Sequence, residues 1–309
     1  MAPADDDISI EEKRVYAGRA GRTDAYIATG SGVVRVSISA DKIGGFELVA
    51  DTPTADVAVR AKRGGPPLLA LATDEGLRVA PLSDETSDLT LSTVTDSPAI
   101  AVDGTEKGFL VGTAEGTIEH LEIVSTAVDT DGATVEHTHT AQIGSVPEPR
   151  AIDWPLIATV EGVYQVDSTG THETLTRVGL GDVNDVSGVG VPLAATTDGL
   201  YWLGNGWMTA INRPTTLVAS DGDGHAMAVV DGEMIVHNGG ESDPSGWDGN
   251  TWTTHPLPVD ETPVAVGYGP GVSAVVTEAG TVCVDVGDGW RHHVVGVRTV
   301  RSVALAASA

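Results

Sequence analysis

A short apolar run, a small polar step containing glycine and a second apolar run recur seven times along the 309 residues of this chain. Clear copies are residues 25–34, 68–77 and 109–118. Each copy has the length of two short strands joined by a tight turn. One glycine anchors each copy: Gly32, Gly76, Gly116, Gly162, Gly199, Gly240 and Gly280. Their mean spacing is about 41 residues.

Repeats of this length are typical of β-propellers, in which each repeat forms one four-stranded blade. Seven copies therefore predict an all-β, seven-bladed β-propeller. Length alone would suggest two domains, but the repeat covers nearly the whole chain. We expect a single propeller domain over residues 1–309, in which residues 1–9 form a disordered acidic lead.

Small apolar runs precede the second to seventh copies and suit the innermost strand of a blade, where seven strands crowd around a narrow channel. The predicted inner strands are residues 56–59, 99–102, 150–153, 186–189, 226–229 and 264–267. The first copy has no such run before it, but one stands at the other end of the chain, at residues 300–306. We therefore expect the C-terminal strand to join the first blade and close the ring, which removes exposed sheet edges.

The charge limits the possible partners. The chain has 44 acidic and 17 basic residues, a formal net charge of −27, and only four of the basic residues are lysines. An acid excess with few lysines is typical of halophilic proteins, because molar salt screens the repulsion between surface charges. Nucleic acid is excluded as an expected partner, since phosphates are bound by Lys and Arg.

The cellular compartment is predicted from three features that the sequence lacks: a membrane span, a secretory signal and a cysteine pair. No apolar run approaches the ~20 residues of a membrane span, so we expect no membrane association. The first 12 residues contain Asp5–Asp7 and lack the apolar core of a secretory signal. The single cysteine, Cys283, excludes an intramolecular disulfide and lies within a Val-Cys-Val strand pattern, which favours a buried structural thiol. We expect a cytoplasmic protein.

No catalytic motif stands out. The chain contains no Gly-x-Ser-x-Gly elbow, Walker loop or cysteine pair, and 44 acidic residues are too many to single out a carboxylate pair. We therefore name no catalytic residue and no cofactor. His137 and His139 would share one face of a strand and are weak candidates for metal ligands, but no third ligand is evident. No metal is expected.

Propellers bind at one end of the central channel, where loops that enter the inner strands converge. The candidate binding residues near those points are Arg63, Arg150, Asp153, Trp154, Asn184, Asp185 and His225. Arg150 and Trp154 are of most interest because they flank one predicted inner strand, and Arg and Trp are common anchors at interfaces. The structural alternative is that Trp154 wedges between blades and Arg150 pairs with one of the many acids.

Across nearly its full length the chain resembles the seven-bladed β-propeller proteins of unknown function that recur in haloarchaea. The residues that carry the resemblance are Ile10–Tyr16, Tyr26–Val36 and the seven-fold pattern itself. The similarity to the wider superfamily of WD-repeat, YVTN and sialidase-like propellers is weaker, since the Gly-His and Trp-Asp dipeptides of WD repeats are absent. The resemblance implies the fold and the host, and it implies no catalytic residue.

Two functions from different classes remain open. The first is a non-enzymatic binding or scaffold propeller, a monomer that engages a protein partner through one face of the ring. It is favoured by a regular scaffold without a recognisable catalytic set. The alternative is a hydrolase or lyase that acts on a sugar or small metabolite at the central channel.

Overall fold

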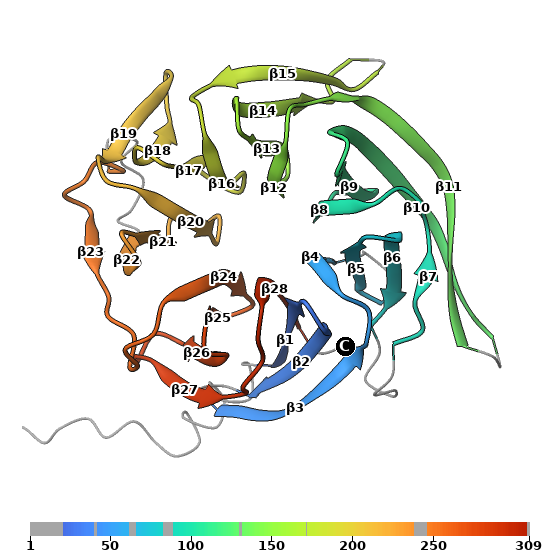
Figure 1. Ribbon diagram of the computed structural model, residues 1–309, viewed down its shortest axis with the longest axis horizontal. Coiled ribbons are helices and arrows are strands. Elements are labelled where there is room, and N and C mark those ends of the chain that lie inside the picture. Colours follow the sequence, from blue (N-terminus) through green and yellow to red (C-terminus); the bar gives the residue numbers. More distant parts are fainter. Residues whose placement is uncertain are drawn as a thin grey trace, which may run out of the picture.

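Seven four-stranded antiparallel sheets follow one another around a ring in the computed structural model (Figure 1). The structure describes residues 21–39, 42–61, 66–82, 89–129, 132–170, 172–237 and 246–307. Side chains are described throughout these ranges except at 124–129 and 132–139. The described part of the chain contains no helix, and hence none that could cross a bilayer.

Each blade extends from an innermost strand beside the channel to an outermost strand, and the first four blades have the following strands in that order. Blade one consists of β28 (Val300–Ala307), β1 (Arg22–Thr29), β2 (Gly32–Ser39) and β3 (Lys42–Ala50). Blade two consists of β4 (Thr54–Arg60), β5 (Leu68–Thr73), β6 (Gly76–Pro81) and β7 (Ser92–Thr93). Blade three consists of β8 (Ala99–Gly104), β9 (Gly108–Thr113), β10 (Thr117–Asp129) and β11 (Gly132–Ser145). Blade four consists of β12 (Pro149–Asp153), β13 (Leu156–Thr159), β14 (Gly162–Asp167) and β15 (Thr174–Gly179).

The last three blades have the same order from the centre outward. Blade five consists of β16 (Val183–Ser187), β17 (Leu193–Thr196), β18 (Leu200–Leu203) and β19 (Trp207–Ile211). Blade six consists of β20 (Thr215–Ser220), β21 (Ala226–Val230), β22 (Glu233–His237) and β23 (Trp252–Thr254). Blade seven consists of β24 (Pro263–Gly269), β25 (Val272–Thr277), β26 (Thr281–Asp285) and β27 (Arg291–Val294).

The ring is closed by the C-terminal strand, as the sequence predicted. Strand β28 pairs antiparallel with β1, from Thr23 opposite Ala307 to Thr29 opposite Val300. The last strand is thereby the inner strand of the first blade, and Figure 1 shows β28 beside β1. The predicted fold class, a seven-bladed propeller closed in this way, is confirmed.

The sixth blade differs from the prediction, which placed its inner strand at residues 226–229. The inner strand is β20, and the predicted run forms the second strand, β21. The glycine in the turn between the second and third strands is consequently Gly232, and the predicted Gly240 lies outside the described residues. The cause is that β21 is small, apolar and fully buried, so its composition is that of an inner strand, whereas β20 begins with two threonines.

The repeated sequence pattern corresponds to the hairpin between the second and third strands of a blade. In blade one, Thr29 is the last residue of the second strand, and its hydroxyl donates a hydrogen bond to the carbonyl of Gly32 at 2.7 Å. In three other blades Thr73, Thr159 and Thr196 make the equivalent hydrogen bond at 2.7–3.0 Å. Gly32 has φ of +136°, and a Cβ there would lie 2.0 Å from a carbonyl oxygen of the next strand. Only glycine fits at such a point.

The apolar core lies between the blades rather than within them. Seven clusters of buried apolar side chains each join two neighbouring sheets, one cluster for each of the seven interfaces. Cys283 is completely buried in the cluster between blades six and seven, and burial raises its pKa to about 12. The thiol is therefore a protonated core group at neutral pH, as the Val-Cys-Val pattern predicted.

Deleting the chain from Arg298 onward removes β28 and should destabilise the whole ring. The deletion exposes the inner edge of β1 and part of the interface between blades one and seven. We expect a single thermal transition at a clearly lower temperature, measured by circular dichroism in molar salt. Equal melting temperatures for the truncated and full chains would show that ring closure contributes nothing.

Candidate functional site

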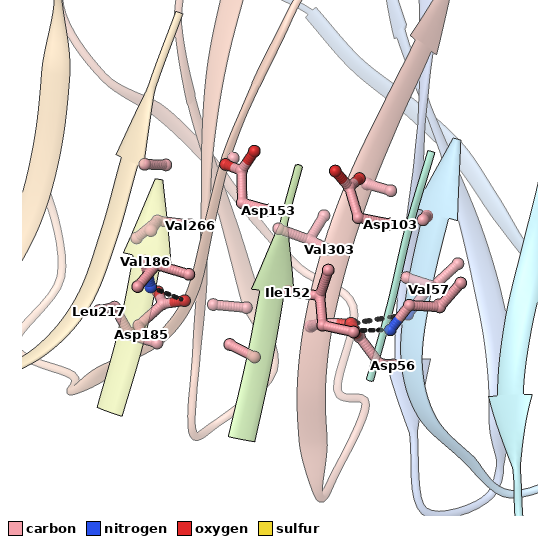
Figure 2. A pocket seen from close by; sticks show the side chains of 18 of the residues that line it. Asp56, Val57, Asp103, Ile152, Asp153, Asp185, Val186, Leu217, Val266 and Val303 are labelled. Carbon is pink, nitrogen blue, oxygen red and sulfur yellow. Dashed lines mark hydrogen bonds between the residues drawn. The ribbon is translucent and has the colours of Figure 1, made fainter. Parts of the chain in front are cut away.

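A cavity of about 500 Å³ lies at the centre of the ring, and every one of the seven inner strands contributes to its wall (Figure 2). Much of the wall is aliphatic, with Val57, Ile152, Val186, Val266 and Val303 among the lining residues. The volume falls in the range of pockets that hold small molecules. The central channel is thus open enough to admit a ligand or part of one.

Four aspartates on the inner strands of four consecutive blades interrupt this aliphatic wall. They are Asp56 on β4, Asp103 on β8, Asp153 on β12 and Asp185 on β16. Figure 2 shows Asp103 and Asp153 at one level of the channel and Asp56 and Asp185 at another. Carboxylates at this depth need hydrogen-bond donors, because burying an unpaired charge is costly.

Asp56 and Asp185 receive their donors in the same way. Asp56 accepts the N–H of its own neighbour Val57 at 2.8 Å and the N–H of Val102 in the next blade at 2.9 Å. Asp185 accepts the N–H of Val186 and the N–H of Val218 in the next blade, both at 2.9 Å. Each carboxylate therefore ties its own inner strand to that of the following blade.

The other two aspartates continue the series around the ring. Asp103 accepts the N–H of Trp154 in blade four at 2.8 Å, and Asp153 accepts the N–H of Gly188 in blade five. Between blades one and two, the Ser302 hydroxyl accepts the N–H of Val57 at 3.0 Å. Five consecutive blade-to-blade junctions thus carry a side-chain oxygen that satisfies backbone N–H groups facing away from their own sheet.

Burial sets the protonation of these carboxyls. It raises the pKa of Asp56 to about 6 and that of Asp185 to about 7. It also raises the pKa of Asp103 and of Asp153, and for Asp103 the negative charge of Asp153 acts in the same direction. The backbone donors oppose the shift but do not cancel it, so these carboxyls titrate nearer neutrality than exposed ones.

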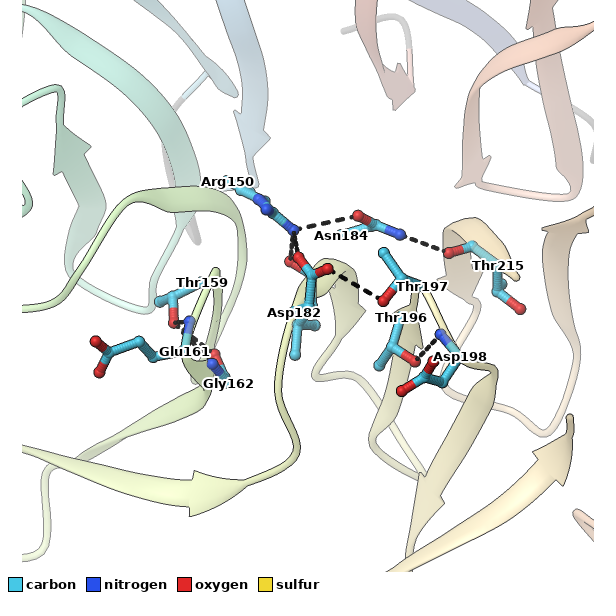
Figure 3. A network of polar contacts seen from close by, with 11 residues as sticks. Arg150, Thr159, Glu161, Gly162, Asp182, Asn184, Thr196, Thr197, Asp198 and Thr215 are labelled. Carbon is cyan, nitrogen blue, oxygen red and sulfur yellow. Dashed lines mark hydrogen bonds and ion pairs between the residues drawn. The ribbon is translucent and has the colours of Figure 1, made fainter. Parts of the chain in front are cut away.

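The rim of the channel carries a separate polar network on the face where the inner strands begin, which we call the start face. The Arg150 guanidinium donates to Asp182 at 2.7 Å, to the Val183 carbonyl at 3.1 Å and to the Asn184 side-chain oxygen at 3.3 Å (Figure 3). Asn184 in turn donates to the Thr215 carbonyl at 2.8 Å. This network links the rims of blades four, five and six.

Asp182 is fixed by two neighbours. It accepts a hydrogen bond from Arg150 and another, at 3.1 Å, from the hydroxyl of Thr197. These contacts lower the pKa of Asp182 below its usual value. Arg301, on β28 of blade one, also lines the cavity but has no hydrogen-bond or ion-pair partner among the described residues. It is the lining cation with spare binding capacity.

The structure brings together four of the seven predicted binding residues: Arg150, Asp153, Asn184 and Asp185 all line the channel cavity. Trp154 does not line it and instead faces a second pocket, between blades three and four. His225 lies in the turn after β20 and pairs with Asp221 at 2.7 Å.

Three other predicted positions have no described side chain. Arg63 lies outside the described residues, and so do the side chains of His137 and His139. Among the described residues, no group of three or more His, Cys, Asp or Glu side chains is placed to hold a metal ion.

Three channel residues were not singled out by the sequence: Asp56, Asp103 and Arg301. The sequence does contain a signal for Asp56. The pair Asp56-Val57 in blade two repeats the pair Asp185-Val186 in blade five at the same point of the inner strand.

Comparison with known proteins places the chain in a family. The family described as "Beta-prop_HVO_0234:-like, beta propeller" matches residues 9–306. The chain belongs to this family. No curated protein matches the sequence. The family assignment agrees with the seven-fold repeat and with the resemblance to propellers of unknown function.

Solved structures with the same fold come from several organisms. A putative 6-phosphogluconolactonase from Bacteroides uniformis has a TM-score of 0.66 and 11% identity over 93% of this chain and 100% of its own. A functionally unknown protein from Desulfotomaculum acetoxidans has a TM-score of 0.61 and 11% identity over 93% and 99%. AztD from Citrobacter koseri has a TM-score of 0.55 and 10% identity over 93% and 98%. At such identities the similarity establishes the fold alone.

The raised pKa of Asp185 predicts a pH-dependent stability. The folded chain keeps a proton up to about pH 7 that the unfolded chain releases near pH ~4. The contribution of this group to the free energy of unfolding is therefore greatest below pH ~4 and is lost as the pH rises toward 7. Asp185→Asn removes the charge and keeps an oxygen for the Val218 N–H. We expect its melting temperature to fall less than that of the wild type between pH 5 and pH 8 in molar salt.

The matched control is Asp198→Asn, in an exposed hairpin of the same blade. Its melting temperature should follow the wild-type pH profile. Parallel profiles for Asp185→Asn and the wild type would contradict the assignment of a buried, proton-binding carboxyl.

Proposed function

We propose that the protein is a binding propeller that holds a protein partner on its start face, with Arg150, Asn184 and Arg301 around the channel mouth as the central contacts. The observation that carries the proposal is a difference between the acidic and the basic side chains of the channel. The four inner-strand aspartates are occupied by backbone N–H groups of adjoining blades, whereas Arg301 at the mouth has no partner among the described residues.

The charge pattern of the start face supports a partner that covers the mouth and its surroundings. Six of the seven hairpins between the second and third strands carry an exposed carboxylate, and blade one has Ser31 instead. These residues are Glu75, Glu115, Glu161, Asp198, Asp231 and Glu278. Acidic hairpins therefore surround a mouth that carries two arginines. A complementary partner would place a carboxylate at the mouth and basic side chains over the hairpins.

The mouth contacts have the chemistry of interface anchors. Arginine is enriched among residues that dominate binding energy, and its planar group suits a carboxylate. Arg150 is held in place by Asp182 and Asn184, so its orientation is largely fixed before a partner arrives. Such preorganisation lowers the entropic cost of binding.

A hydrolase or lyase in the channel is the second candidate, and one observation favours it. Asp103 and Asp153 face the same cavity and interact electrostatically, an arrangement that can divide acid and base roles between two carboxyls. Turnover of sugars or small metabolites that is abolished by Asp153→Asn and by Arg150→Ala would favour this alternative over the binding role.

The binding proposal predicts that the double variant Arg150→Ala, Arg301→Ala loses its partner. Wild-type protein incubated with a lysate of the source organism in molar KCl should capture a partner in stoichiometric amount. The purified partner should bind the double variant at least ~10-fold more weakly, because arginine is enriched among the interface residues whose truncation costs more than ~1 kcal/mol.

Arg291→Ala is the matched control, since Arg291 is also paired with an aspartate but lies on the outermost strand of blade seven. It should bind the partner as the wild type does. Absence of a stoichiometric partner, or equal binding by the double variant, would overturn the proposal.

A further inference from the structure

A second cavity, of about 550 Å³, lies between blades three and four. Its lining includes Thr105 and Trp154, which directly follow the inner strands β8 and β12. It therefore opens on the face where inner strands end, opposite the start face that we assign to a partner. The blades that enclose it are neighbours in Figure 1. Nothing in the proposed binding role uses this pocket.

Three side chains from separate segments form a continuous hydrogen-bonded series in this pocket. The Thr105 hydroxyl lies 2.8 Å from Nε2 of His120. Nδ1 of His120 lies 2.8 and 2.9 Å from the two carboxylate oxygens of Glu173. Thr105 and His120 are buried, yet all three residues line the cavity. A hydroxyl, a base and a carboxylate that orients the base are the parts of an activated nucleophile.

The hydrogen bonds fix the direction of proton transfer. A carboxylate accepts only, so the proton of the neutral imidazole lies on Nδ1 and points to Glu173. Nε2 is then the free acceptor for the Thr105 hydroxyl proton. The Thr105 oxygen already accepts the N–H of Gly108 at 3.0 Å, which leaves its own proton to donate to His120.

The surroundings hold this series in place. Buried Arg60, from blade two, donates to the carbonyls of Thr105 at 2.9 Å and Glu106 at 2.5 Å, and so fixes the turn that carries the hydroxyl. The ring of Trp154 lies 5.8 Å from the His120 ring, and its backbone N–H is held by Asp103. The site is therefore supported by packed elements of blades two, three and four.

We propose that this pocket hydrolyses small carboxylic esters or lactones through a covalent acyl-threonine. The Thr105 oxygen attacks the carbonyl carbon while its proton passes to Nε2 of His120. The intermediate collapses, the C–O bond to the alcohol breaks, and the alcohol oxygen takes the proton from His120. The alcohol of an ester then leaves, whereas that of a lactone stays attached to the acyl group. Water then attacks the acyl group with His120 as base, which releases the carboxylic acid and restores the Thr105 hydroxyl.

The pocket wall indicates a neutral substrate. Glu122 and Glu173 line it, and the ammonium of Lys107 lies 3.5 Å from Glu122. Anionic substrates are disfavoured there, and the carboxylate product is repelled after hydrolysis.

The test combines active-site labelling with hydrolysis, both in molar salt on the full chain. A fluorophosphonate probe should add to the wild type once, and peptide mapping should place it on Thr105. The wild type should hydrolyse p-nitrophenyl acetate or δ-valerolactone above the rate of the buffer. Thr105→Ala, His120→Gln and Glu173→Gln should each lower kcat/KM at least ~100-fold.

Two further variants separate chemistry from structure. Thr105→Ser keeps the hydroxyl and all its partners but lacks the methyl group, so it should be labelled faster than the wild type. His172→Ala, in the same wall but outside the hydrogen-bonded series, should hydrolyse esters as the wild type does. Absence of both labelling and hydrolysis in folded wild type and Thr105→Ser, or full hydrolysis by folded Thr105→Ala, would overturn the proposal.

Discussion

The structure depends on how the backbone N–H groups at the inner edge of each sheet find hydrogen-bond acceptors. Every inner strand is the edge strand of its sheet, so some of its N–H groups have no partner within that sheet. Asp56, Asp103, Asp153, Asp185 and Ser302 bring acceptor oxygens to these groups at five consecutive junctions. A buried N–H without an acceptor costs about as much as a lost hydrogen bond. Polar oxygens at the centre of the ring are therefore part of its construction.

The same interactions explain why the aspartates of the channel have raised pKa values. Carboxyls placed where they can reach the next blade are removed from bulk water, and their pKa values rise because burial disfavours the charge. Among the described residues, the junctions around blade seven have no such carboxylate: Leu217 and Ala265 occupy the positions that Asp56 and Asp185 hold in their blades. There the buried apolar clusters join the blades instead.

The two faces of the ring consequently offer different chemistry. On the start face, Arg150 and Arg301 stand at a mouth surrounded by acidic hairpins, which suits recognition of a complementary surface. On the other face, a buried histidine lies between a hydroxyl and a carboxylate at the wall of a cavity, which suits proton transfer. Both sites lie in parts of the blades that do not repeat, because the repeated residues are engaged in hairpins and interfaces.

The sequence by itself determined the number of blades, most of their hairpins and the closure of the ring, because strand periodicity, the Thr and Gly of most turns and the inner-strand run at the C-terminus are local signals. It did not distinguish β20 from β21, since the second strand β21 has the small, apolar composition expected of an inner strand, whereas the inner strand β20 begins with two threonines. Only the tertiary structure decided which carboxyls meet which N–H groups, and that His120 lies beside Thr105 and Glu173. Those residues are 15 and 53 positions apart in the chain. Contacts at such separations depend on how neighbouring blades pack, which no local pattern records.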